Sequence, residues 1–308
     1  MSKSLSDLIV EAHGLVKSFG RVTALDGLDL RVERGEVHGF LGPNGAGKST
    51  TIRALLGQIR LDGGSASVMG MDPWRRAVDI HERLAYVPGD TALWPGLTGG
   101  QCIDVLGGIH GAMNQKRRDE LVERFELDPT RRFRTYSKGN RLKVALVAAL
   151  ACDVDLLILD EPTSGLDPLM EAVFQGVVTE LANQGVSVLL SSHILAEVET
   201  LCGRVTVVRS GRGVFSGSLV SLRASAPSAI EAVTERAPEG LERIDGVADL
   251  MVSADPHGTR ITALVDARGL PAALAQVARA RPLQVAVRPP SLEQLFLEQY
   301  SDEGGERP

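Results

Sequence analysis

The sequence is poor in cysteine and in aromatic residues, and its charge balance is acidic. Its three cysteines, Cys102, Cys152 and Cys202, are widely spaced and form neither a CxxC pair nor a cluster with histidine. We expect them to be small core residues in a reducing compartment, and neither disulfides nor metal ligands. Aromatic residues make up 4% of the chain, and its formal net charge is −6. Both values argue against a nucleic-acid partner, which favours a basic surface with stacking aromatics.

Long apolar runs are also missing. The longest stretches, such as residues 144–152, fall well short of the roughly 20 residues that a membrane-spanning helix needs. The first residues do not form a basic segment followed by an apolar one, so the chain is not expected to be secreted. Its length of 308 residues, against a typical domain of about 150, suggests two domains.

Strand and helix patterns alternate through the first two thirds of the chain. Such alternation implies a parallel sheet flanked by helices. Residues 98–151 show three helical patterns and hardly a strand candidate, which predicts a helical subdomain attached to this α/β core. The predicted strands lie at residues 9–12, 25–32, 37–41, 65–69, 156–159 and 186–190, and the predicted helices at 47–57, 168–182 and 194–201.

The composition changes after residue 222, where alanine and proline become frequent. The pattern predicts a small α+β domain over residues 223–300 and a disordered polar tail at 301–308. Its predicted strands lie at residues 230–234, 247–253, 260–265 and 283–287, and its predicted helices at 269–280 and 291–300.

A glycine-rich segment between an apolar strand and a helix has the spacing of a P-loop. Its glycines let successive backbone N–H groups point at phosphates where the helix starts. We expect Lys48 to reach the β- and γ-phosphates of ATP, and the Ser49 hydroxyl to ligate Mg²⁺. A plain glycine-rich turn is the alternative, but the flanking strand and helix argue against it. The segment reads Gly42, Pro43, Asn44, Gly45, Ala46, Gly47, Lys48, Ser49, Thr50.

Two carboxylates end the apolar strand predicted at residues 156–159. Asp160 is expected beside the P-loop, where it would hold the magnesium shell. Glu161 would then act as general base or orient the attacking water. A strand that ends in two acids usually only meets solvent, but its position downstream of a P-loop favours a nucleotide site.

In this order the motifs resemble those of ABC transporter nucleotide-binding domains, and the resemblance covers residues 7–222. Residues 136–141, Tyr-Ser-Lys-Gly-Asn-Arg, resemble the signature loop, which is LSGGQ in the family. Residues 164–167 resemble the D-loop, and His193 resembles the switch histidine. The resemblance implies an α/β P-loop nucleotide-binding domain with a helical subdomain at about 98–151, followed by the small C-terminal α+β domain.

The resemblance also implies roles for further residues. The signature residues Ser137, Lys138 and Gly139 would bind ATP held by a second subunit, and the start of a helix suits such phosphate binding. Asp167 would lie with them at the nucleotide. Phe19 stands where the family stacks an aromatic ring on adenine, although core packing is an alternative for this residue.

The other histidines have no such motif around them. We interpret them as surface or satisfied core residues: His13, His38, His81, His110 and His257.

The signature loop departs from the family consensus. Tyr136, Lys138 and Asn140 replace the consensus Leu, Gly and Gln. This version is similar to that of drug and antibiotic exporters in the family. The positive charge of Lys138 would be favourable near a phosphate.

A second departure is Gly89, which stands where the family usually has the glutamine of the Q-loop. A glycine has no side chain that could ligate magnesium or position water, and Asp90 is a candidate substitute. Residues 97–101, Leu-Thr-Gly-Gly-Gln, look closer to the consensus signature than residues 136–141 do. They lie too near the Q-loop position and too far from Asp160, so we interpret them as a loop and a helix start.

Residues 290–297 resemble the C-terminal ending of daunorubicin-resistance-type exporter ATPases. This implies an accessory domain that pairs or regulates the ATP-binding subunits, with a packing appendage as the alternative. The resemblance as a whole implies an ATPase that uses ATP and Mg²⁺ and drives a separate multi-span membrane permease from the cytoplasmic side of the membrane. It also implies a second ATP-binding subunit, and a homodimer is favoured. The alternatives are a soluble ABC ATPase without a permease and a degenerate regulatory half of a heterodimer.

Overall fold

The computed structural model describes residues 7–110, 113–224 and 227–288. The chain divides into two compact units, residues 1–217 and 218–308. The helix predicted at 291–300, the segment 290–297 and the tail at 301–308 lie outside the described residues. None of the helices in the described ranges combines the length and apolar character that a membrane span requires.

A mostly parallel six-stranded sheet forms the centre of the first unit. Its strands follow the order β5-β6-β7-β3-β8-β9, and neighbours from β5 to β8 run parallel. All residues of β3, β6 and β7 are buried, as expected for strands covered on both faces. The strands are β3 (Val37–Leu41), β5 (Leu84–Val87), β6 (Leu156–Asp160), β7 (Ser187–Ser192), β8 (Arg204–Arg209) and β9 (Arg212–Ser218).

A second, antiparallel sheet has the order β2-β1-β4. It consists of β1 (Leu8–Phe19), β2 (Val22–Glu33) and β4 (Gly63–Val68). Apolar residues of β1 and β2 enter one hydrophobic core with residues of the parallel sheet, such as Phe40 and Leu189. Both sheets therefore share the core that supports the start of α1 (Lys48–Leu55).

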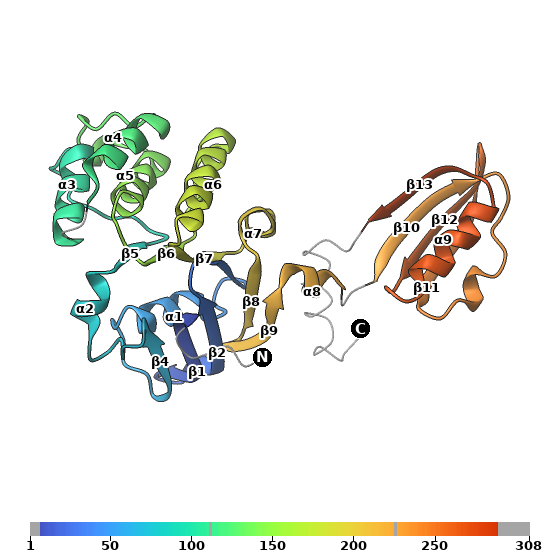
Figure 1. Cartoon of the computed structure of the whole chain (residues 1–308), viewed down its shortest axis with the longest axis horizontal. Helices are drawn as coiled ribbons and strands as arrows, with labels where there is room; N and C mark the ends of the chain where they lie inside the picture. The colour runs from blue at the N-terminus through green and yellow to red at the C-terminus, as the bar shows by residue number, and fades with distance from the viewer. Residues whose placement is uncertain (1–6, 111–112, 225–226, 289–308) are drawn as a thin grey trace. The chain divides into compact units, whose positions relative to one another are not determined.

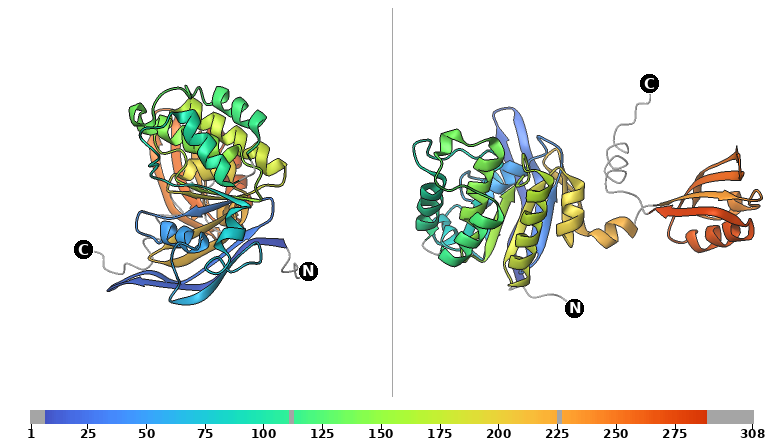
Figure 2. Two further views of the ribbon diagram at one scale, coloured as in Figure 1. Left: turned by 90° about the vertical axis from the view of Figure 1, so that its left-hand side faces the viewer. Right: turned by 90° about the horizontal axis from the view of Figure 1, so that it is seen from above.

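The stretch at 98–151 contains the three predicted helices, and α3 packs against α5. They gather apart from the antiparallel sheet (Figure 1), and Figure 2 shows the same separation from two further sides. These elements are α3 (Gly99–His110), α4 (Gln115–Arg124), the short 3-10 helix η2 (Phe133–Thr135) and α5 (Lys138–Leu150).

Residues 97–101 are indeed a helix start. The Thr98 hydroxyl accepts a hydrogen bond from the Gln101 backbone N–H at 3.2 Å, and Gln101 Oε1 accepts one from the Thr98 N–H at 2.9 Å. This reciprocal pair is a capping box, which satisfies two N–H groups at the beginning of α3. The resemblance of this segment to a signature loop is thus explained by helix capping.

The remaining helices of the first unit connect its strands. The helices predicted at 168–182 and 194–201 are confirmed, whereas α2 and the strands β5, β8 and β9 were not predicted. Helix α2 and strand β5, of five and four residues, are too short to show a clear pattern, and the strands also depend on pairing with strands distant in the sequence. The helices are α2 (Ala77–His81), α6 (Pro168–Asn183) and α7 (Leu195–Leu201).

The second unit has an antiparallel sheet of order β11-β12-β10-β13 with α9 on one face (Figure 1). Its core includes Ile230, Ile261, Ala273 and Val277. The four predicted strands and the helix predicted at 269–280 are confirmed. The elements are α8 (Leu219–Ala224), β10 (Ser228–Thr234), η3 (Leu241–Arg243), β11 (Val247–Asp255), β12 (Gly258–Val265), α9 (Leu270–Arg279) and β13 (Pro282–Arg288).

Candidate nucleotide-binding site

The P-loop connects β3 to α1 in the backbone conformation that its glycines allow. Gly45 has φ +81° and Gly47 has φ +110°, in the left-handed region that residues with a Cβ rarely adopt. A Cβ on Gly47 would also lie 2.8 Å from the carbonyl oxygen of Ala24 in β2. The loop is therefore closed against the antiparallel sheet, and its sequence is restricted by both backbone angle and space.

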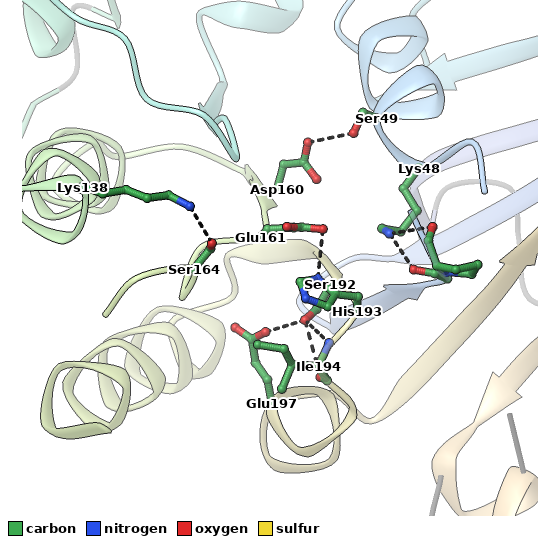
Figure 3. Close-up of polar contacts among 12 residues, drawn as sticks. Lys48, Ser49, Lys138, Asp160, Glu161, Ser164, Ser192, His193, Ile194 and Glu197 are labelled. Atoms are coloured by element: carbon green, nitrogen blue, oxygen red, sulfur yellow. Dashed lines mark hydrogen bonds and ion pairs between the residues drawn. The ribbon is translucent and has the colours of Figure 1, made fainter. Parts of the chain in front are cut away.

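Lys48 is the first residue of α1, and its side chain turns back into the loop. Its Nζ donates hydrogen bonds to the carbonyl oxygens of Gly42 at 2.6 Å and Pro43 at 3.2 Å. Burial lowers the pKa of Lys48, while the negative charges of Glu161 and Asp160 raise it. The ammonium thus lies in the loop that would hold phosphates and faces the two carboxylates that end β6 (Figure 3).

Ser49 and Asp160 are brought together from distant parts of the chain. Ser49 Oγ donates a hydrogen bond to Asp160 Oδ2 at 3.3 Å. Asp160 is the last residue of β6 and is 7% exposed, whereas Ser49 is exposed. A hydroxyl and a carboxylate oxygen at this distance fit the oxygen ligands that Mg²⁺ prefers beside phosphates.

Glu161 and His193 form a second polar pair next to the first. His193 Nδ1 lies 3.0 Å from Glu161 Oε1, with the two side chains 47% and 27% exposed. Glu161 has φ +50°, and its backbone N–H donates to the Ser191 carbonyl at 2.9 Å. A left-handed backbone at a non-glycine residue is strained, and such strain concentrates at functional sites. The strained turn aims the carboxylate at the histidine at the end of β7.

The predicted signature residues lie at the start of α5, against the D-loop. Ser137 is the N-cap of α5, and its hydroxyl accepts a hydrogen bond from the Asn140 N–H at 3.3 Å. Lys138 Nζ donates to Ser164 Oγ at 3.1 Å. A Cβ on Gly139 would collide with the carbonyl oxygen of Gly165. The glycine at 139 is therefore needed for this packing whatever it binds.

Asp167 and Phe19 have local contacts of their own. Asp167 is the N-cap of α6, and its Oδ1 accepts hydrogen bonds from the backbone N–H groups of Leu169 and Met170 at 3.1 and 3.0 Å. Phe19 ends β1, is 49% exposed, and has the Lys17 ammonium 5.5 Å from its ring centroid. Asp167 thus has a structural role as a cap, and Phe19 is an exposed ring rather than a core residue.

Gly89 follows β5 and lies close to the carboxyl end of β6. A Cβ at this position would be 3.2 Å from the carbonyl oxygen of Asp160. Gly89 and Asp90 line a cavity of about 210 Å³ together with the signature residues Tyr136 and Lys138. The Q-loop position, the signature loop and the D-loop are therefore neighbours within one chain.

Two residues that the sequence analysis did not single out also belong to this region. Ser192 and Glu197 lie beneath His193 and are 1% and 4% exposed. Their sequence signal is weak: a serine before the histidine and a glutamate four residues after it.

His38, interpreted as a surface or satisfied core residue, is fully buried. Its two ring nitrogens lie 3.0 Å from Glu36 and 2.9 Å from Thr206, so it is a satisfied core residue.

The cysteines are buried and free of disulfides. Burial raises the pKa of the Cys152 thiol to about 11 and also raises that of Cys202. The thiols therefore stay protonated and pack as small apolar groups.

Comparison with known proteins gives consistent matches. The family described as ABC transporter matches residues 25–164. The chain is 37% identical to the daunorubicin resistance ATP-binding protein DrrA3 of Streptomyces coeruleorubidus, over 97% of this chain and 98% of that protein. It is 34% identical to the Nod factor export ATP-binding protein I of Paraburkholderia xenovorans, over 95% and 97%. A solved ATP-binding subunit of an ABC transporter superposes with a TM-score of 0.67 at 29% identity, covering 70% of this chain and 92% of that one.

Proposed function

We propose a function from the premise that this chain belongs to the ABC transporter family, as an ATP-binding subunit that hydrolyses ATP. Its first unit has the α/β P-loop fold of that family, which confirms the predicted fold class. We infer that the chain drives the export of a drug or antibiotic through a separate membrane permease. The names of its relatives support this, since they include proteins for daunorubicin resistance and for Nod factor export.

One observation carries the proposal. Lys48 and Ser49 of the P-loop meet Asp160 and Glu161 at the carboxyl end of β6, and His193 joins them from the end of β7. Ligands of open α/β sheets bind at the carboxyl ends of the strands. This cluster contains the parts that phosphoryl transfer requires: a phosphate-binding loop, a metal ligand pair and a candidate base.

The roles of these residues follow from their chemistry. Lys48 and the P-loop N–H groups would bind the phosphates of ATP, and Ser49 and Asp160 would hold Mg²⁺, which offsets charge on the phosphates. Glu161 would accept a proton from the attacking water. His193 would hold the γ-phosphate side of the site and orient Glu161 through their 3.0 Å contact. Electrostatic positioning of this kind supplies most of the catalysis in phosphoryl transfer.

The signature residues point to a second subunit. Lys138 lies on the other side of the end of β6 from Lys48, bound to Ser164 (Figure 3). We therefore propose that Ser137, Lys138 and Gly139 of one subunit bind ATP held by the P-loop of another, with Asp167 and Phe19 at the edges of that site. A homodimer of this chain, bound to its permease at the cytoplasmic face of the membrane, is the simplest arrangement. ATP binding would then favour one permease state through contacts that differ between states.

Affinity isolation of the tagged chain from host membranes in mild detergent tests the transport assignment. We expect a multi-span membrane protein to copurify in fixed stoichiometry and to raise the ATPase rate. Isolation of the chain with ribosomes, with nucleic acid or alone would reject the permease while leaving the ATPase assignment intact.

A further inference from the structure

A buried carboxyl group lies beneath the loop that carries His193. Glu197 is in α7, the short helix that follows this loop, and it is only 4% exposed. Its Oε1 has no hydrogen-bond partner within the described residues. Burying a carboxyl group with an unsatisfied oxygen costs free energy. A hydrogen bond to its other oxygen offsets part of that cost.

That contact runs through Ser192 to the backbone of the loop that carries His193. Ser192 Oγ donates a hydrogen bond to Glu197 Oε2 at 2.6 Å. Ser192 Oγ also accepts a hydrogen bond, from the Ile194 backbone N–H at 2.9 Å. The two residues on either side of His193 are therefore tied to each other and to Glu197 (Figure 3).

The polar pair Glu161 and His193 is partly exposed, whereas the residues that hold the loop from below are buried. The side chains of His193 and Glu161 are 47% and 27% exposed, whereas Ser192 and Glu197 are almost fully buried. An exposed histidine on a short loop has many rotamers and backbone positions available, and holding one of them costs entropy. A rigid buried support reduces that cost and keeps a catalytic contact in place.

Glu197 also lies near the segment that follows Glu161. Burial raises the pKa of Glu197, and the nearby Thr163 hydroxyl partly opposes this. Thr163 itself is 4% exposed. The carboxyl is thus packed between the two segments that meet at the Glu161–His193 contact.

We propose that Glu197 is a positioning residue for ATP hydrolysis: through Ser192 it holds the loop that places His193 against Glu161. The inference rests on the proposed function, because it assigns Glu197 an effect only through His193. Among the described residues its hydrogen bond runs to Ser192, so we expect its loss to lower turnover and to leave ATP binding unaltered.

The test compares single and double variants of the full-length chain, alone and with its copurified membrane partner. We expect Glu197→Ala and Ser192→Ala each to lower kcat about tenfold, with the Kd for a fluorescent ATP analogue changed less than twofold. Glu197→Gln keeps a side chain that can bond Ser192 Oγ, and we expect it to restore most of the rate. The double variant Glu197→Ala with His193→Ala should be no slower than His193→Ala alone, because contacts in one chain of interactions are not additive.

Thr200→Ala, at an exposed position of the same helix, is the matched control; it removes a hydrogen bond from the Thr200 hydroxyl to the Ala196 carbonyl within the helix and should keep the wild-type rate. Wild-type turnover in Glu197→Ala would overturn the inference, as would rate losses that multiply in the double variant. Equal losses of kcat, ATP binding and Tm in both Glu197→Ala and Glu197→Gln would also overturn it, since they indicate a purely structural role. Full activity of His193→Ala would instead contradict the proposed function.

Discussion

In the nucleotide-binding unit every residue of β3, β6 and β7 is buried, whereas β13 in the C-terminal unit has no buried residue. Strands β3, β6 and β7 are covered on both faces, and their carboxyl ends lead into a cluster of polar residues. Within the described residues, strand β13 lies at the edge of a sheet that α9 covers on one face. Ile158 in β6 is fully buried, but Val285 in β13 is 43% exposed.

The difference shows where a precise site can be built. Side chains at the end of a strand that is packed on both faces are held in place with it, because close-packed interiors resist displacement. Asp160 is the last residue of the buried strand β6, and Glu161 follows it directly. Strands β11 and β13 of the C-terminal sheet have no buried residue, and this sheet supplies none of the predicted site residues.

The largest expected effects lie at the end of the buried strands. Glu161→Gln should lower kcat by about 10²–10⁴-fold while ATP still binds, because the amide cannot accept the proton of the attacking water. Lys48→Ala should weaken nucleotide binding itself, because it removes the positive charge from the phosphate loop. Steady-state hydrolysis and equilibrium binding of a fluorescent ATP analogue separate the two outcomes. Full turnover in Glu161→Gln would reject its role as base.

Core truncation compares the two sheets directly. Ile158→Ala should lower the free energy of unfolding by about 2–5 kcal/mol, through lost burial and the cavity left behind. Val285→Ala should cost less than about 1 kcal/mol, because nearly half of the side chain is already in water. Both tryptophans, Trp74 and Trp94, belong to the first unit, so their fluorescence in urea follows its unfolding while circular dichroism follows both units. Equal losses of unfolding free energy in Ile158→Ala and Val285→Ala would contradict the difference in packing between the two sheets.

The buried carboxyl of Glu197 should make the stability of the first unit depend on pH. Burial raises the pKa of Glu197; Glu171 adds to this, and the hydroxyls of Ser192 and Thr163 and the charge of His193 oppose it. The folded state therefore keeps the Glu197 proton to higher pH than the unfolded chain does. The stability that this proton contributes is complete below the unfolded pKa and is lost as pH rises through the folded pKa.

Glu197→Gln removes this loss. Its free energy of unfolding, relative to wild type, should therefore increase from pH 4 to pH 8, by about 1.4 kcal/mol for each unit of pKa elevation. Urea unfolding at a series of pH values measures it. A difference that stays constant with pH would show that the folded and unfolded pKa values are equal.

Surface ion pairs should distinguish the two units least. Arg124 and Glu180 join α4 to α6 through two hydrogen bonds of 2.7 and 2.9 Å, whereas Arg281 and Glu235 in the second unit lie 3.5 Å apart. All four side chains are more than a third exposed. Double-mutant cycles should give about 0.5–1 kcal/mol for the first pair and close to zero for the second, and less at high salt. A larger coupling in the Arg281 pair would reverse the expected order.

Local pattern predicted much of this fold. The strands at 37–41 and 156–159 were predicted from apolar runs, and the helices at 47–57 and 168–182 from their helical pattern. Strand β5 was not predicted, because four residues carry too little pattern and their pairing with β6 decides their conformation. The family resemblance was carried by the order of motifs, and comparison with known proteins agrees with it.

The sequence by itself determined which residues are proposed to carry the chemistry, because the P-loop and the acidic end of β6 are each continuous in the chain. It also determined the helix starts at Thr98 and Ser137, where capping depends on residues three positions apart. Only the tertiary structure decided the contacts between segments, such as Lys138 with Ser164 and His193 with Glu161. Those contacts depend on how strands far apart in sequence are ordered in one sheet. No local pattern contains that order, because it follows from burying the apolar faces of the whole chain together.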